Sequence, residues 1–256
     1  MDWTDDAIVL SARRHGENAA IVQLLTLEHG RHAGLVRGGF GKRQRGIIQP
    51  GNRVRAHWTA RLAEHLGHYT LEMTSPAAAL LLDSPKLLAA LSAACSVAAA
   101  ALPEREPHQP LFDGLCALIG NLVGDAETPD QVDLAGAGLV RWELELLRDL
   151  GFGLDLQSCA VTGKRDGLCY VSPRTGRAVT LEGAGIYRDK LLPLPGFLVG
   201  GDSNDVDGQK SENRSLGQQV RDGLRLTGYF VDRNIFAPHG GKMPPARQRF
   251  EEIFAE

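Results

Sequence analysis

Acidic residues are missing from one long part of this chain. No Asp or Glu occurs between Glu28 and Glu64, whereas that interval holds eight basic side chains. They are Arg31, Arg37, Lys42, Arg43, Arg45, Arg53, Arg55 and Arg61. Residues 1–75 carry 10 basic and 7 acidic side chains, and residues 76–256 carry 18 and 24. Segregated positive charge of this kind is typical of a protein that binds a polyanion, although a solvated basic face without a ligand has the same pattern.

Cysteines and aromatic residues are also scarce. The four cysteines, Cys95, Cys116, Cys159 and Cys169, are scattered, with no paired spacings. This excludes a disulfide framework and favours reduced thiols in a cytosolic protein. Aromatic residues make up 6% of the chain, which limits the base stacking that a nucleic-acid surface could offer.

Long hydrophobic runs are absent as well. The most apolar stretch, Leu87 to Leu102, is mostly alanine and is shorter than the about 20 strongly apolar residues that a membrane span needs. The N-terminus is acidic and lacks the basic start and apolar run of a secretion signal. We therefore expect a soluble protein without membrane contact, located in the cytoplasm and, if it binds DNA, at the nucleoid.

Motifs for catalysis and for metal binding are missing too. The chain has no nucleophile elbow and no His-Glu-x-x-His pattern, which favours a binding or mediator role over an enzyme. Cys159 and Thr162 resemble half of a zinc knuckle whose second cysteine is lost, and Cys169 alone cannot complete a tetrahedral site. His57, His65 and His68 are close in sequence but lack an accompanying carboxylate cluster. We expect no metal and no cofactor.

The pattern along the chain predicts an α+β protein with two domains. In residues 1–76, short apolar or alternating runs favour a five-stranded barrel of the OB type. The runs are 7–10, 20–27, 31–37, 53–59 and 66–73. Residues 77–256 read as a helical bundle.

The first predicted helix of this domain begins after Ser84 and ends at Pro103. Further helices are predicted over 110–123, 131–150 and 216–231, with a short one after Pro245. Asp130 is a candidate helix cap. An irregular insertion over 152–198 contains a predicted hairpin, 168–171 with 177–180, and a polar loop over 200–215 is expected to be flexible.

The sharpest local signal is the segment from Gly38 to Gly46. Its glycines let the backbone approach a phosphate closely, and its cations supply charge, although a mobile hairpin tip would look similar. No Ser or Thr follows the Gly-Lys pair, so it is not a P-loop. The candidate DNA-binding residues are Arg37, Phe40, Lys42, Arg43, Arg45, Arg53, Arg55 and Arg61.

Phe40, Trp58 and Tyr69 could each stack on a base, but the alternation around Trp58 favours a place in the core. We therefore expect binding that is dominated by the phosphate backbone and depends steeply on salt.

An ordered set of motifs over nearly the full length resembles the DNA repair protein RecO family. In the first domain it includes Val36-Arg37-Gly38, Gln49-Pro50-Gly51 and Glu64-His65-Leu66-Gly67. Further along, Gly151 to Leu156, Leu191 to Pro195 and Leu226-Thr227-Gly228 continue the match. Only the loop over 200–215 falls outside it.

This resemblance implies a non-enzymatic recombination mediator that binds single- and double-stranded DNA and anneals complementary strands. Its implied partners are RecR, often RecF, and the acidic tail of the single-stranded-DNA-binding protein (SSB), and it helps to load RecA. Family members can hold zinc at the insertion, but Thr162 departs from that pattern. On the helical domain, Arg141 matches a basic family position beside an aromatic residue, and Arg148 is a weaker candidate for the SSB tail.

Two alternatives stay open. The chain could be a scaffold whose basic barrel docks an acidic protein and has no annealing activity. A nuclease-like activity in the helical domain would be the enzymatic alternative, against which the lack of an acidic cluster near the basic segment argues. In the scaffold case, removing Lys42, Arg43 and Arg45 would leave DNA affinity unchanged.

Overall fold

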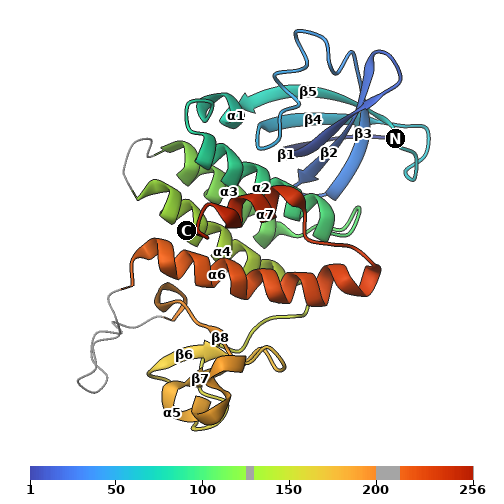
Figure 1. Ribbon diagram of the computed structural model, residues 1–256. Coiled ribbons are helices and arrows are strands. Elements are labelled where there is room, and N and C mark those ends of the chain that lie inside the picture. The colour runs from blue at the N-terminus through green and yellow to red at the C-terminus, as the bar shows by residue number, and fades with distance from the viewer. Residues whose placement is uncertain (125–129, 200–213, 256) are drawn as a thin grey trace. The chain divides into compact units, whose positions relative to one another are not determined.

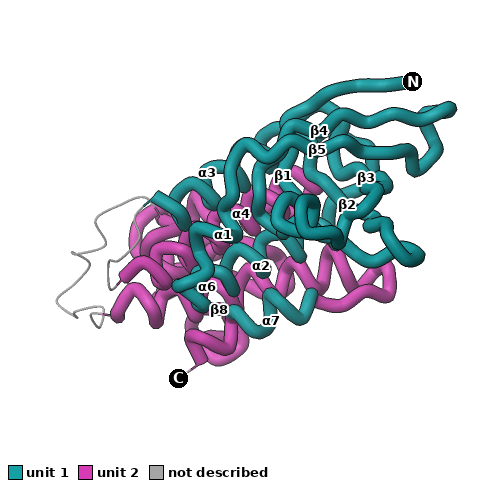
Figure 2. Tube along the Cα trace, turned by 90° about the horizontal axis from the view of Figure 1, so that it is seen from above, with its two compact units in different colours: residues 1–128, 244–250 teal, residues 129–243, 251–256 magenta. Residues whose placement is uncertain are grey.

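A computed structural model describes residues 1–124, 130–199 and 214–255 of the chain. It has two compact units, which Figure 2 colours separately. Unit 1 comprises Met1–Thr128 and Pro244–Phe250, and unit 2 comprises Pro129–Met243 and Glu251–Glu256. The predicted loop over 200–215 lies outside the described residues except for its last two. The predicted domain boundary at residue 76 stays a prediction.

Unit 1 begins with five strands that form a closed barrel in the order β1-β2-β3-β5-β4 (Figure 1). Neighbouring strands are antiparallel except β3 and β5, which run parallel and meet at Leu35 and His68. The strands are β1 (Asp2–His15), β2 (Ala19–Thr26), β3 (Gly30–Arg37), β4 (Arg53–Thr59) and β5 (His68–Ser75). The predicted five-stranded fold is confirmed, with longer strands at the N-terminus than the apolar runs indicated.

The barrel core follows from alternation along the strands. On β4, Val54, Ala56 and Trp58 point inward and are buried, whereas Arg53 and Arg55 between them are exposed. Trp58 is therefore a core residue, as the alternation predicted, and its indole Nε1 donates a hydrogen bond to the Leu66 carbonyl at 3.0 Å. Strand β2 is buried on both faces because the next long helix of the unit, α2, also contacts it.

Helices complete unit 1. They are α1 (Ala77–Leu80), α2 (Pro85–Ala101), α3 (Gln109–Gly124) and α7 (Pro245–Glu252), whose last two residues fall in unit 2. Ser84 and Pro85 start α2 as predicted, although the Ser84 side chain makes no capping hydrogen bond. The backbone of Gly51 approaches Leu91 of α2 so closely, at a φ of +87°, that a Cβ atom there would lie 2.5 Å from the leucine side chain. A glycine is thus required where the barrel meets this helix.

Two long helices, α4 (Gln131–Asp149) and α6 (Leu216–Val231), dominate unit 2. Gly136 packs on Val220 and Gly223 on Val140, so the two helices run parallel and closely approach at their glycines. Between them the Thr227 hydroxyl donates a hydrogen bond to the buried Glu143 carboxylate at 2.5 Å. Ser215 and Gln218 start α6 with a capping box. Asp130 precedes α4, but its side chain forms no cap hydrogen bond.

The insertion between α4 and α6 forms a small sheet in the order β7-β6-β8, which projects beside α6 in Figure 1. The predicted hairpin is confirmed as β6 (Leu168–Val171) and β7 (Ala178–Thr180). A third strand, β8 (Leu192–Pro193), was not predicted, because it is only two residues long and one of them is a proline. The short helices of this unit are α5 (Leu181–Ala184), η1 (Gly185–Lys190), η2 (Gly196–Leu198), η3 (Asp232–Phe236) and η4 (Ala237–His239).

Across the described ranges, every helix is too short or too polar to pass through a bilayer.

Candidate nucleic-acid interface

The basic segment predicted to meet phosphate forms the connection between β3 and β4. Turn hydrogen bonds hold its backbone, including Gly41 N to Gly38 O at 2.8 Å and Gln44 N to Gly41 O at 3.1 Å. The buried Asn52 amide donates to the Gly46 carbonyl at 2.7 Å. Ile48 is 1% exposed and belongs to the barrel core, so the segment is anchored at its far end as well. These contacts hold the backbone of the segment at its turns and at its far end.

Four of the predicted cations are presented outward at this connection. Arg37 ends β3, and Lys42, Arg43 and Arg45 follow in the turns, all with exposed side chains. None of them forms an ion pair with any residue that the structure describes. Their charge is therefore available to an external anion such as a phosphate.

Two further arginines, which the sequence analysis missed, join these four. Arg13 and Arg14 are exposed at the end of β1, and Arg14 pairs with Ala20 of β2. The guanidinium carbon of Arg14 lies 4.8 Å from the centroid of the Phe40 ring, which places the β1–β2 turn against the basic connection. In Figure 1 the β1–β2 turn and the β3–β4 connection rise from the same end of the barrel. In the sequence, two adjacent basic residues just before the turn glycine Gly16 are the pattern that could have identified Arg13 and Arg14 as candidates.

We call this set the basic end of the barrel: Arg13, Arg14, Arg37, Lys42, Arg43 and Arg45. Phe40 sits beneath it, half-buried, where it packs against the barrel core and carries Arg14 on its ring. Its packing role is thus defined, and its contact with DNA stays a prediction.

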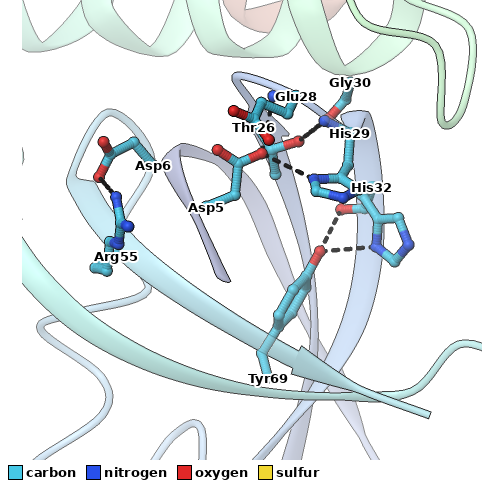
Figure 3. Close-up of polar contacts among 9 residues, drawn as sticks. All are labelled: Asp5, Asp6, Thr26, Glu28, His29, Gly30, His32, Arg55 and Tyr69. Carbon is cyan, nitrogen blue, oxygen red and sulfur yellow. Dashed lines mark hydrogen bonds and ion pairs between the residues drawn. The ribbon is translucent and has the colours of Figure 1, made fainter. Parts of the chain in front are cut away.

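The remaining candidates on β4 and after it differ in their surroundings. Arg53 is exposed at the start of β4. Arg55 is held by Asp6 of β1, with 3.0 Å between Nη1 and Oδ1, and this hydrogen bond and charge raise the pKa of Arg55 (Figure 3). Glu72 of β5 lies opposite Arg55 on the other side. Among the described residues, Arg55 therefore has a carboxylate partner within the barrel, unlike the cations of the basic end, and its contact with DNA stays a prediction.

Arg61 lies at the opposite end of the barrel from the basic end. The residue before it, Ala60, hydrogen-bonds through its backbone to Met1 at the start of β1, whereas Arg13 and Arg14 lie at the end of this 14-residue strand. The structure therefore does not bring Arg61 together with Lys42, Arg43 and Arg45. Another of the eight cations, Arg31, donates through Nε to the Leu102 carbonyl at 2.6 Å and pairs with Glu104, which makes it structural.

The barrel aromatics pack on one another. Trp3 is stacked on His29, with ring centroids 4.2 Å apart, and on Trp58, at 5.6 Å. Tyr69 is buried, and its hydroxyl lies 2.8 Å from Nδ1 of His32 (Figure 3). Burial, with smaller effects from Arg105 and His29, lowers the pKa of His32 to about 4, so its ring is neutral at pH 7. Aromatic faces that are already covered cannot stack on bases.

The same part of the barrel contains a buried carboxylate. Asp5 is 4% exposed, and its Oδ2 accepts a hydrogen bond from the Glu28 backbone N–H at 2.8 Å and lies 3.0 Å from the His29 ring (Figure 3). These contacts tie the turn between β2 and β3 to β1. The carboxylate of Asp5 therefore has a structural role in the barrel.

The degenerate knuckle of the insertion is organised around the Cys159 sulfur. Cys159 is buried, and its Sγ accepts hydrogen bonds from the backbone N–H groups of Thr162 at 3.4 Å and Thr180 at 3.3 Å. Burial opposes ionisation, but hydrogen bonds from Thr162 and Thr180 prevail and lower the pKa of Cys159 to about 6. In the described ranges no group of three or more His, Cys, Asp or Glu side chains could hold a metal ion. The likeness of this turn to a zinc knuckle stays an interpretation of the sequence.

The two predicted partner-binding arginines lie on α4. Arg141 is exposed, donates through Nη2 to the Phe197 carbonyl at 3.3 Å, and has its guanidinium carbon 5.0 Å from the Phe197 ring centroid. The aromatic partner is thus Phe197 of η2, because the neighbouring Trp142 is buried. Arg148 forms an ion pair with Glu145 on the same helix. Arg141 thus lies beside an aromatic ring, whereas Arg148 pairs with a carboxylate of its own helix, and their role in partner binding stays a prediction.

Comparisons with known proteins cover nearly the whole chain. The family model for the N terminus of recombination protein O matches residues 1–76, and the model for its C terminus matches residues 82–243. A DNA repair protein RecO of Rhodospirillum centenum is 53% identical over 99% of this chain and 95% of its own length. Proteins with the same name from Rhodospirillum rubrum and Granulibacter bethesdensis are each 47% identical, over 98% and 100% of this chain and 96% of their own lengths.

Proposed function

Because the chain belongs to the RecO family of DNA repair proteins, we propose that the basic end of its barrel binds single- and double-stranded DNA and promotes annealing of complementary strands. Membership confirms the resemblance read from the sequence and makes this a DNA-binding protein of repair and recombination. The annealing activity and its location at the basic end are the steps that we add.

The observation that carries this proposal is the set of six exposed cations without an ion-pair partner among the described residues. Two DNA strands repel each other through their phosphates. Lys and Arg side chains that neutralise phosphates release condensed counterions and lower that repulsion. Annealing by this route needs no covalent step, so we propose a mediator without enzymatic activity, metal or cofactor.

A salt series tests the proposal. Complementary oligonucleotides coated with SSB are annealed in the presence of the wild type or the Lys42→Ala/Arg43→Ala/Arg45→Ala variant. We expect the wild type to accelerate annealing. The variant should lose rate and show a DNA-binding salt slope shallower by up to about 2 units, since each lost contact to a single strand contributes about 0.7.

Arg55→Ala is a single-substitution control at an arginine that already pairs with Asp6. It should leave the slope close to that of the wild type. If neither the wild type nor the triple variant accelerates annealing, the annealing proposal fails and the scaffold alternative takes its place.

Family membership and the surroundings of Arg141 support a proposal about partners. We propose that the chain acts with RecR, and with RecF where present, to help RecA replace SSB on single-stranded DNA in the cytoplasm at the nucleoid. An acidic SSB tail that ends in an apolar residue would pair its carboxylates with Arg141 and place the apolar end beside Phe197. The exposed cation stacked on an aromatic ring supports this site.

A further inference from the structure

The tip of the insertion exposes large apolar side chains that its small sheet does not cover. Ile186 is 91% exposed, Tyr187 60% and Leu181 53%. They lie on α5 and on the 3₁₀ helix η1, which follow β7 directly. In Figure 1, α5 lies at the far side of the small sheet from α6. An aromatic side chain with this exposure contrasts with the barrel, where Trp3, Trp58 and Tyr69 are covered by their neighbours.

Basic residues outnumber acidic ones in the insertion that carries this tip, although the chain outside the barrel is acidic. Residues 152–198 hold six basic and four acidic side chains. Two of the six are matched by carboxylates, in the pairs Lys164–Glu182 at 2.7 Å and Arg177–Asp155 at 3.2 Å. Arg165, Arg174 and Lys190 are exposed and form no ion pair within the described ranges. Asp166 and Asp189 also form no ion pair within the described ranges, so the six basic and four acidic side chains leave the insertion a net charge of +2.

The 3₁₀ geometry of η1 determines which of its side chains lie on the same side of the helix. In a 3₁₀ helix, side chains three positions apart are eclipsed and lie about 6 Å apart along the axis. In η1 this places Tyr187 and Lys190 on one side, one turn apart. Arg188 lies on another side, where its Nε donates a hydrogen bond to the Tyr170 hydroxyl at 2.7 Å and braces η1 against β6. An exposed ring and a free ammonium group on the same side are the elements that bind a single nucleic-acid strand.

We propose that the insertion tip is a second nucleic-acid contact, specific for single strands, in which Tyr187 stacks on a base and Lys190 meets a neighbouring phosphate. This rests on the proposed DNA-binding function. The two contacts differ in chemistry: the aromatic ring among the barrel cations, Phe40, is half-buried and carries Arg14, whereas Tyr187 at the tip is exposed beside Lys190. Bases in a duplex already stack on each other, so their faces are closed to Tyr187, whereas an unpaired strand offers them. The tip thereby adds preference for unpaired DNA to a chain whose barrel recognises phosphates in either form.

Substitution of Tyr187 in the full-length protein tests the stacking. Binding of a fluorescein-labelled oligo(dT) and of a duplex of equal length is compared for Tyr187→Ala, Tyr187→Leu and Tyr187→Phe. We expect Ala and Leu to weaken oligo(dT) binding by about 5-fold or more, the lower end of the range for one stacked base, and Phe to preserve it. Duplex binding should not change in any of the three. Lys190→Ala should make the oligo(dT) salt slope shallower by about 0.7.

The outcomes separate this inference from the proposed function. If all three Tyr187 variants bind oligo(dT) as the wild type does, the tip inference is overturned, whatever the barrel variant shows. If Leu preserves binding and Ala does not, the contact is apolar rather than stacking, and the inference is again overturned. If the Lys42→Ala/Arg43→Ala/Arg45→Ala variant binds and anneals DNA normally, the proposed function of the barrel fails. The comparison of Tyr187→Leu with Tyr187→Phe still tests whether Tyr187 stacks on a base. Thermal melting of each variant checks that the exposed substitution leaves the fold intact.

Discussion

At the scale of single residues, the barrel separates side chains that serve the fold from those that remain available. Arg31 forms an ion pair with Glu104, and Arg55 forms one with Asp6. No such partner is found among the described residues for Lys42, Arg43 or Arg45. The sequence presents all five as equivalent basic residues. Only the tertiary structure distinguishes them, because Asp6 on a neighbouring strand and Glu104 after α2 are remote from their arginines in the sequence.

His32 gives a pH dependence at this scale. Its side chain is 3% exposed and faces Trp3, Trp58 and Tyr69, and burial lowers its pKa to about 4 from the ordinary 6.5. Since the unfolded chain binds the proton more readily, the neutral ring contributes stability above pH 6.5, and this contribution is lost as the pH falls toward 4. We expect the loss to reach up to about 3 kcal/mol.

Urea unfolding at a series of pH values measures this. A His32→Gln variant should be less stable at pH 7 but lose less stability between pH 6.5 and pH 4. His15→Gln, at the exposed end of β1, is the control and should follow the wild type. Equal pH profiles for all three proteins would show that His32 does not titrate in this way.

At the scale of elements, small residues determine how helices approach. A Cβ atom at Gly136 of α4 would lie 2.3 Å from the Val220 side chain of α6, whereas nothing lies within 4 Å of one at Gly120 of α3. Valine is stiff at χ1 and cannot give way easily. Both glycines lie inside helices, so propensity alone treats them alike.

Alanine at these two positions should therefore have opposite effects on stability. We expect Gly136→Ala to lower the free energy of unfolding by about 1–3 kcal/mol through overpacking against Val220. Gly120→Ala should raise it by up to about 1 kcal/mol, because alanine favours the helix over glycine. Chemical denaturation of both variants measures the difference. A Gly136→Ala protein as stable as Gly120→Ala would contradict the close packing of α4 on α6.

The basic connection between β3 and β4 likewise combines features that the sequence pattern predicts with contacts that only the tertiary structure shows. Its turn glycines and cations were evident from the sequence. Its anchors were not, because Ile48 in the core and the Asn52 amide on the Gly46 carbonyl are contacts that no periodic pattern marks. The third strand of the insertion sheet, β8, was missed for a related reason, since pairing with β6 and not propensity makes it a strand.

At the scale of the whole molecule, the location of charge matters more than its total. The chain is acidic overall, with a formal net charge of −3, yet six unpaired cations converge at one end of the barrel. If this local concentration drives DNA binding, removing two charges there should have a larger effect than removing two elsewhere.

Two double variants with the same change in net charge make the comparison. Arg13→Ala/Arg14→Ala removes two cations of the basic end, and Arg221→Ala/Arg225→Ala removes two exposed arginines of α6. We expect the first to weaken single-strand binding and to make the salt slope shallower by about 1.4, and the second to leave both near the wild-type values. Equal effects of the two variants, measured by fluorescence anisotropy over a salt series, would point to net charge rather than to the basic end.

Patterns along the chain are enough to predict the α+β class, the five strands of the barrel, the long helices and the segment richest in unpaired cations. These depend on local periodicity, on proline and glycine positions and on composition, all of which are written along the chain. The tertiary structure alone decided that Arg13 and Arg14 join the basic end, that Arg61 lies apart from it, and that Asp6 neutralises Arg55. It also decided that the barrel aromatics cover one another while Tyr187 is exposed. Strand register and barrel closure bring together residues far apart in sequence, and charge pairing and exposure depend on those neighbours.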